Sequence, residues 1–143
     1  MGLKPGQRVY PAARFSRQAE MREVAAWLRV HGYSCAPAWL GEGHQMPRKA
    51  DQTSNAQWAT FAQDDVRDLA QADIVICFTE PEGTPSTRGG RHVELGMALA
   101  MQKRVIVVGP RENVFTWLPE VEHYHGWVAC QTALWSWQWQ ERL

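Results

Sequence analysis

The chain has 143 residues, of which 45% are hydrophobic, and 15 Lys and Arg residues balance 15 Asp and Glu residues, so the formal net charge is zero. This length is usual for one domain with its own core. The hydrophobic content excludes a disordered chain, and the zero net charge argues against a protein held on a nucleic acid polymer by bulk charge. No apolar run approaches the roughly 20 residues of a membrane span, and the first residues lack the apolar stretch of a secretory signal. We therefore expect one cytoplasmic domain over residues 1–143 with no membrane partner.

Cysteine and tryptophan are the two residue types whose placement is informative. The three cysteines, Cys35, Cys77 and Cys130, are far apart and form no CxxC pair, so the sequence predicts neither a metal site nor a disulfide framework. Half of the eight tryptophans lie near the C-terminus, at Trp127, Trp135, Trp137 and Trp139. The pattern favours a C-terminal segment, residues 127–143, that packs on the core or on a second subunit, with stacking on a nucleobase as the alternative.

Hydrophobic periodicity predicts strands and helices in alternation. The expected strands are residues 9–10, 33–39, 74–78 and 105–109. The expected helices are residues 16–31, which Ser16 caps and Gly32 ends, then 57–71 and 91–102, with a short helix at 111–118. In residues 131–142 the alternation of Trp135, Trp137 and Trp139 fits a strand, but Ala133, Leu134 and Trp137 suit a helix, and we interpret the segment as a helix. Residues 41–55 are polar and contain Gly and Pro, which predicts a long mobile loop of the kind that often serves function.

Buried strands that alternate with helices predict an α/β fold, a flavodoxin-like (Rossmann-like) parallel sheet flanked by helices. Ligands of such sheets bind at the carboxyl ends of the strands, near the point where the strand order reverses. The loops after Tyr10, Phe78 and Val108 should meet there.

The strongest local signal is the segment 89–96, GGRHVELG, at the junction of a loop and a helix. Two glycines permit close approach to the backbone, and free N–H groups at a helix start favour an anion. Glu94 lies about one turn into this helix, where an acidic residue often only complements the helix dipole. Because the loop belongs to the predicted ligand crevice, a catalytic role for Glu94 stays open beside that structural one.

Asp65 is the second signal. On the predicted helix it shares the face of the apolar residues Trp58, Phe61, Ala62, Val66 and Leu69, whereas Asp64 and Asp68 are better placed as solvated charges. A carboxylate on an apolar face must be paired or used, and a structural hydrogen bond to the backbone is the alternative to a role in a site. Two carboxyl groups at one crevice suit glycosidic chemistry.

The remaining candidates are basic, and several common motifs are absent. Arg14 follows the first strand, and Arg88 and Arg91 flank the glycines, so each is a candidate for an anion, with a surface arginine as the alternative for Arg14. His92 is better explained as a helix-surface histidine. There is no GxGxxG, no GxxxxGK[ST] and no GxSxG, which disfavours dinucleotide-binding, P-loop and α/β-hydrolase enzymes.

Three segments together resemble the nucleoside 2-deoxyribosyltransferase-like superfamily, which includes deoxyribosyltransferases and deoxynucleoside 5′-monophosphate N-glycosidases. They are DVRDLAQAD followed by IVI at 65–76, GGRHVELGMALA at 89–100, and VIVVGPRENVF at 105–115. The resemblance covers roughly residues 8–125 and is closest to small phage and bacterial members. It implies a flavodoxin-like sheet, a homodimer or higher homo-oligomer whose neighbour sometimes completes the pocket, a small-molecule nucleoside or nucleotide substrate, and no cofactor.

The resemblance also assigns roles to residues. Glu94 matches the nucleophile that attacks the anomeric carbon, and Asp65 matches the second acid, which orients the sugar or assists departure of the base. Arg14 loosely matches a phosphate-loop arginine, although the loop PAAR lacks the usual Gly-Ser. The implied substrate-binding set is Tyr10, Arg14, Arg88, Gly89, Gly90, Arg91 and Asn113.

One position departs from the family pattern. Six residues before the nucleophile the transferases carry Asp and the nucleotide hydrolases Ser, whereas this chain has Arg88, with Ser86 and Thr87 nearby. Hydrolysis and transfer to another base therefore both stay open. The basic side chains of Arg14, Arg88 and Arg91 favour a phosphorylated substrate. A nucleotide-binding or signal-sensing module without catalysis is the alternative function, and an interaction protein that uses the Trp-rich tail is a weaker one, because it gives Asp65 and Glu94 no role.

Overall fold

The computed structural model describes residues 6–41, 54–85 and 88–142, and the side chains up to residue 136. The elements follow one another as β1 (Val9–Ala12), η1 (Phe15–Arg17), α1 (Gln18–Val30), η2 (Ala38–Leu40), α2 (Asn55–Gln71), β2 (Ile74–Phe78), α3 (Gly90–Ala100), β3 (Arg104–Val108), η5 (Val114–Trp117), β4 (Glu122–Tyr124) and α4 (Trp127–Arg142). The predicted loop at 41–55 lies almost entirely outside the described residues.

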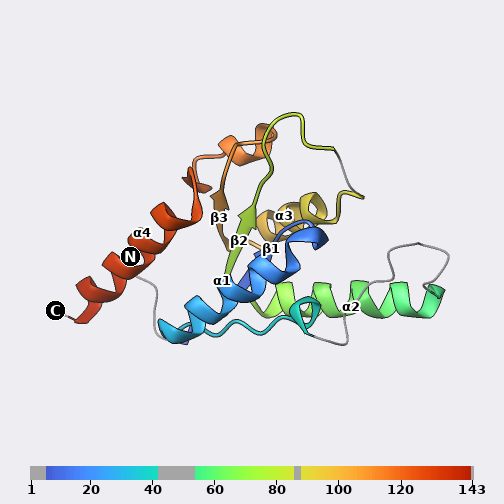
Figure 1. Cartoon of the computed structure of the whole chain (residues 1–143), viewed down its shortest axis with the longest axis horizontal. Coiled ribbons are helices and arrows are strands. Elements are labelled where there is room, and N and C mark those ends of the chain that lie inside the picture. The colour runs from blue at the N-terminus through green and yellow to red at the C-terminus, as the bar shows by residue number, and fades with distance from the viewer. Residues whose placement is uncertain (1–5, 42–53, 86–87, 143) are drawn as a thin grey trace.

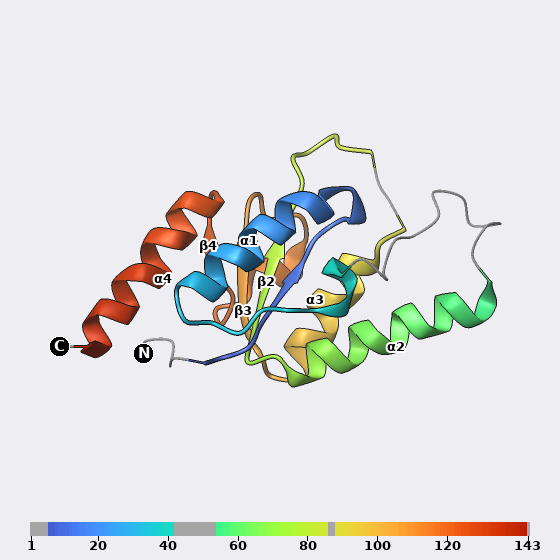
Figure 2. The same ribbon diagram turned by 60° about the horizontal axis from the view of Figure 1, so that its bottom comes forward.

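The four strands form one parallel sheet in the order β1-β2-β3-β4. Helices α1 and α4 cover one face and α2 and α3 the other (Figures 1 and 2). β2 is buried along its whole length, and β3 is buried except at its first residue, as their continuous apolar runs predict. The expected α/β fold with a parallel sheet flanked by helices is therefore confirmed.

The predicted strand at 33–39 is wrong. Only Ser34 makes a bridge, to Arg8 beside β1, and the chain then turns into η2. Pro37 has no backbone N–H to donate and stands at the N-cap of η2, which explains why pairing does not continue. Trp39 instead covers this edge of the sheet, because its indole N–H donates to the carbonyl of Pro11 at 3.1 Å.

Several boundaries also differ from the prediction. Ser16 lies inside η1 and does not cap α1, whose N-cap is Arg17, whereas Gly32 adopts the positive φ of +93° expected at the end of that helix. Pro11 lies within β1, beyond the predicted end of the strand. The three-residue strand β4 was missed because its polar residues show no apolar alternation. The C-terminal segment is helical, as predicted, from Trp127 onward.

Helix α2 packs less of its apolar face than its periodicity predicts. Ser54 forms a capping box with Gln57 at its start, and Leu69 near its end is buried. Val66 is 44% exposed, and Trp58 and Phe61 are only half-buried. Figure 2 shows the reason, since the first half of α2 extends beyond the sheet. The end of α2 that lies over the sheet is the end that bears Asp65.

Candidate active site

Glu94 is placed by the glycine turn that begins α3. Gly89 is the N-cap residue and has a φ of +84°, a conformation that favours glycine, and Gly90 begins the helix. Glu94 follows one turn later on the side of α3 that faces the sheet, where its carboxylate accepts a hydrogen bond from the Tyr10 hydroxyl of β1. The glycine turn therefore sets where the carboxyl group of α3 meets the first strand.

The Glu94 carboxyl group is held away from water. Burial raises its pKa to about 7, the hydrogen bond from Tyr10 opposes that rise, and the negative charge of Asp65 adds to it. The Oε2 atom is buried and has no hydrogen-bond partner among the described residues. A buried carboxylate oxygen without a partner is costly in free energy, which is typical of a group kept for a ligand.

Tyr10 is 1% exposed and lies opposite Val75 in the parallel register of β1 and β2. Burial raises the pKa of its hydroxyl far above the usual range, and the charges of Glu94 and Asp65 raise it further. Tyr10 therefore remains a neutral hydrogen-bond donor to Glu94 at every physiological pH.

Asp65, on α2, is the third side chain of the group that contains Tyr10 and Glu94. Burial raises its pKa to about 6, and the neighbouring charges of Asp68 and Asp64 raise it further. Its Oδ1 atom is buried and has no hydrogen-bond partner among the described residues. The charge of Asp65 acts on both Glu94 and Tyr10, so the three side chains are near enough for electrostatic interaction, although they come from α2, α3 and β1. The structure thus brings together the two carboxyl groups that the sequence singled out.

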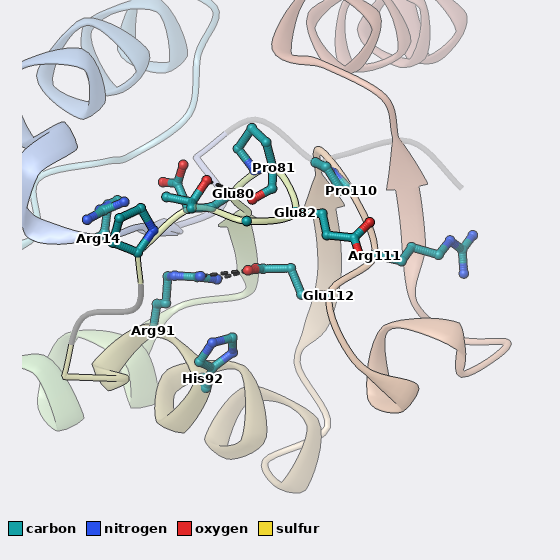
Figure 3. A pocket seen from close by; sticks show the side chains of 12 residues that line it. Arg14, Glu80, Pro81, Glu82, Arg91, His92, Pro110, Arg111 and Glu112 are labelled. Atoms are coloured by element: carbon teal, nitrogen blue, oxygen red, sulfur yellow. Dashed lines mark hydrogen bonds and ion pairs between the residues drawn. The ribbon is translucent and has the colours of Figure 1, made fainter.

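A cavity of about 500 Å³ opens beside this group at the carboxyl ends of the strands (Figure 3). Its walls are the loops after β1, β2 and β3 and the first turn of α3, namely Arg14, Glu80, Pro81, Glu82, Gly83, Thr84, Pro85, Arg91, His92, Pro110, Arg111 and Glu112. The three loops therefore meet as predicted. Glu94 and Asp65 do not line the cavity. The pKa of Cys77 in β2 is raised to about 12, chiefly by burial, and the charges of Glu94, Arg91 and Glu112 also act on it.

Two arginines of the predicted substrate-binding set, Arg14 and Arg91, line the cavity, and only Arg91 is paired with a carboxylate of the described residues. Arg14 lines the cavity, and its Nε atom is buried with no partner among the described residues. Arg91 also lines it but forms a two-bond ion pair with Glu112, one bond of which measures 2.7 Å (Figure 3). Arg14 is therefore the better placed of the two to meet an added anion.

The other two predicted contacts lie elsewhere. Arg88 is exposed and sits over the Trp58 ring, 5.2 Å from its centroid, which ties the loop before α3 to the start of α2. Asn113 caps η5, because its side-chain oxygen accepts a hydrogen bond from Phe115 N at 3.0 Å. Neither lines the cavity. Ser86 and Thr87, which were weighed against Arg88, lie outside the described residues.

Sequence reasoning missed several charged side chains near the cavity and misjudged Asp68 on α2. Glu80 and Glu112 line the cavity, and Arg17 holds Glu80 at 3.4 Å while donating to the Thr79 carbonyl. The position of the two glutamates directly after β2 and β3 was an available signal. Asp68 is not a solvated charge as predicted, because its carboxylate accepts a hydrogen bond from Ala38 N at 2.7 Å.

Within residues 6–41, 54–85 and 88–142, no helix is long and apolar enough to cross a membrane. The same residues contain no group of three or more His, Cys, Asp or Glu side chains that could hold a metal ion. What the described residues do present is two carboxyl groups with raised pKa values and a tyrosine donor, beside a cavity at the strand ends of a parallel sheet. Such a combination is typical of the active site of an α/β enzyme.

The family model for nucleoside 2-deoxyribosyltransferase matches residues 6–129, and the chain belongs to that enzyme family. A 2-deoxyribosyltransferase from Bacillus psychrosaccharolyticus is similar in fold, with a TM-score of 0.62 and 18% identity over 87% of this chain and 90% of that one. A CMP N-glycosidase from Clostridium botulinum is also similar, with a TM-score of 0.53 and 20% identity over 83% of this chain and 90% of that one. No curated protein matches the sequence.

Proposed function

We propose that this enzyme cleaves the N-glycosidic bond of a nucleoside or a nucleoside 5′-monophosphate, with Glu94 as the nucleophile and Asp65 as the acid. The observation that supports this most is the buried, unpartnered Oε2 atom of Glu94 within reach of a second carboxyl group and a neutral tyrosine. Family membership supports the same class of reaction, and the deoxyribosyltransferase and the CMP N-glycosidase of similar fold are examples of transfer and of cleavage.

In the first step the Glu94 carboxylate attacks the anomeric carbon of the sugar and forms a glycosyl ester. The bond from that carbon to the base nitrogen breaks, and the base leaves with the electron pair and takes a proton from Asp65. The hydrogen bond from Tyr10 holds Glu94 in place and favours its charged form.

In the second step an acceptor attacks the anomeric carbon and releases Glu94 as a carboxylate. If the acceptor is water, its proton passes to the Asp65 carboxylate and the free sugar is released. If the acceptor is a second base, the same step makes a new nucleoside. One glycosyl ester thus serves both hydrolysis and transfer, and the acceptor decides between them.

Replacing Tyr10 by Phe should move the pH optimum of base release upward. The active form needs Glu94 ionised and Asp65 protonated, so activity should peak between about pH 6 and 7, where this coupled pair titrates. Loss of the Tyr10 hydrogen bond raises the pKa of Glu94, and a lost bond to a charged group lowers the rate about tenfold. A pH series of kcat/KM measures both effects, and an unchanged optimum would show that Tyr10 does not act on Glu94.

The proposal extends to a 5′-phosphate bound by Arg14, because the Arg14 side chain lines the cavity and its buried Nε atom has no hydrogen-bond partner among the described residues. Arg14→Gln should raise KM for a nucleoside 5′-monophosphate by about tenfold to a hundredfold, in line with the loss of a charge-assisted bond, and leave KM for the nucleoside nearly unchanged. Arg88→Gln is the matched control, since Arg88 lies over Trp58 outside the cavity. An equal effect of Arg14→Gln on both substrates would contradict the assignment.

We also propose a homo-oligomer that works in the cytoplasm. Val66 on α2 is 44% exposed and Val93 on the neighbouring α3 is 62% exposed, so apolar area is available for a second copy. Cys35, Cys77 and Cys130 are buried free thiols, as suits a reducing compartment. Light scattering after size-exclusion chromatography should give a mass of at least twice 16.3 kDa, and a monomeric mass at micromolar concentration would contradict the proposal.

The experiment that tests the function is chromatography of the free bases released from a panel of nucleosides and 5′-monophosphates, with and without an acceptor base. Release without acceptor identifies a hydrolase, and release only with acceptor identifies a transferase. A nucleotide-binding module is the second candidate, because the cavity of about 500 Å³ is lined by Arg14, Arg91 and Arg111 and does not include the carboxyl pair. Tight binding with no release from any substrate would support that candidate and contradict the enzyme.

A further inference from the structure

Helix α2 bears three carboxyl groups close together, and one arginine contacts two of them. Arg67 forms an ion pair with Asp64 at 3.1 Å and with Asp68 at 3.3 Å. Asp65, which lies between them in sequence, has a buried oxygen with no partner among the described residues. Asp65 affects both Tyr10 and Glu94 electrostatically, Asp68 also affects Tyr10, and the two ion pairs of Arg67 involve Asp64 and Asp68.

Asp68 also anchors α2 to the edge of the sheet. Its Oδ2 atom accepts a hydrogen bond from Ala38 N at 2.7 Å, at the start of η2. The neighbouring Trp39 is fixed in turn to β1 through Pro11 and to α1 through Gln18, whose side chain donates to the Trp39 carbonyl at 2.6 Å. Asp68 thus connects α2 to the segment of Ala38 and Trp39, which hydrogen bonds fix to both β1 and α1.

Asp65 and Asp68 are three residues apart, so they lie on one side of the helix, one turn from each other. A bond that fixes the rotation of α2 at Asp68 also fixes the direction in which Asp65 points. In addition, the negative charge of Asp68 acts on Asp65 across this single turn, and among the neighbouring charges it is the one that raises the pKa of Asp65 most.

We propose that Asp68 is a positioning residue for base departure, which directs Asp65 toward Glu94 through the bond to Ala38 N and favours a proton on Asp65 through its charge. This inference rests on the proposed function, in which Asp65 gives its proton to the leaving base. The charges that raise the pKa of Asp65 are those of Asp68 and Asp64 on α2, both of which pair with Arg67, and the charge of Asp65 in turn acts on Glu94 of α3 and Tyr10 of β1. Among them Asp68 alone combines a charge next to Asp65 with a bond to another segment of the backbone.

The two parts of this role are separated by two variants. Asp68→Asn keeps an oxygen that accepts from Ala38 N but removes the charge, so the pKa of Asp65 should fall by about half a unit, the size expected for a partly screened charge one turn away. The pH optimum of base release should then move downward, opposite in sign to the shift expected for Tyr10→Phe. Asp68→Ala also removes the bond to Ala38 N, so kcat should fall further with KM nearly unchanged.

The pKa of Asp65 is measured by NMR titration of the side-chain carboxyl carbons, which needs no substrate. Asp64→Asn is the matched control on the same helix, because it removes a charge that has no bond to η2; it should give a smaller pKa shift and no additional loss of kcat. An Asp68→Asn protein that releases base with the wild-type Asp65 titration and the wild-type pH optimum would overturn this inference alone. A wild-type protein that releases no base would overturn the proposed function, and with it the catalytic meaning of Asp68.

Discussion

Replacing Glu94 by Gln should abolish base release, by a factor of about a thousand or more, as expected when a nucleophile is removed. The amide has nearly the shape of the carboxyl group, and its oxygen still accepts the hydrogen bond from Tyr10, so the fold should survive. Chromatography of released base measures the loss, and circular dichroism confirms the fold.

The same variant should be more stable than the wild type at alkaline pH. The folded-state pKa of Glu94 is raised from 4.5 to about 7, so protonated Glu94 stabilises the fold fully below about pH 4.5, and that contribution is lost as the pH rises through 7. The free energy of unfolding of Glu94→Gln should therefore exceed that of the wild type by about 1–3 kcal/mol at pH 8, the upper limit being the whole pKa shift. At pH 4.5 the difference should be small.

Glu20→Gln is the matched control for this stability effect. Glu20 is an exposed glutamate of α1, and the hydrogen bond from Arg17 lowers its pKa, so its removal gives no gain in stability at pH 8. Urea unfolding at pH 5 and pH 8 compares the three proteins. A Glu94→Gln protein that keeps wild-type activity, or that loses stability at pH 8, would contradict the role and the burial assigned to Glu94.

Replacing Asp65 by Asn should lower base release by about a hundredfold to ten-thousandfold, the range of general acid catalysis. The loss should depend on the leaving group. The base of a 7-methylpurine nucleoside bears a positive charge and leaves without taking a proton, so Asp65→Asn should release this base in the first turnover at nearly the wild-type rate, whereas Glu94→Gln should lose base release from both kinds of substrate.

Paired rate measurements with a purine nucleoside and its 7-methyl derivative separate the two roles. Equal losses for Asp65→Asn on both substrates would mean that Asp65 orients the sugar and does not protonate the base. Asp64→Asn controls for the loss of a negative charge from α2, because Asp64 pairs with Arg67 and forms no part of the proposed chemistry.

The sequence predicted those parts of the molecule that depend on local chain chemistry. The apolar runs of β2 and β3, the helix that follows Gly89 and the placement of Asp65 on the inner side of α2 are all properties of short segments. The fold class predicted that the loops after β1, β2 and β3 meet at one edge, because parallel strands bring their carboxyl ends together. It did not by itself predict that Asp65, inside α2, lies near Glu94.

The partners that charged side chains find in the fold could not be predicted from the sequence, because these partners lie far away in the chain. The sequence analysis made both Arg91 and Arg88 candidates for binding an anion. In the structure Arg91 pairs with Glu112, and Arg88 sits over the ring of Trp58, thirty residues earlier in the chain. Asp68 was judged solvated because nothing local predicts its bond to Ala38 N. A charged residue near a site in sequence therefore counts as a ligand contact only when no partner in the fold already binds it.

The central claim is a covalent bond between Glu94 and the sugar, and its most direct test is mass spectrometry of the intact protein quenched in acid. Asp65→Asn mixed with a 7-methylpurine nucleoside, without an acceptor base, should accumulate the glycosyl ester, because the first step needs no acid and the second lacks the base that activates water. We expect the protein mass to rise by one sugar residue, on a peptide that contains Glu94, and no rise when Glu94 is also replaced by Gln. Base released at an undiminished rate with no adduct on that peptide, or by the protein that lacks Glu94, would contradict the account.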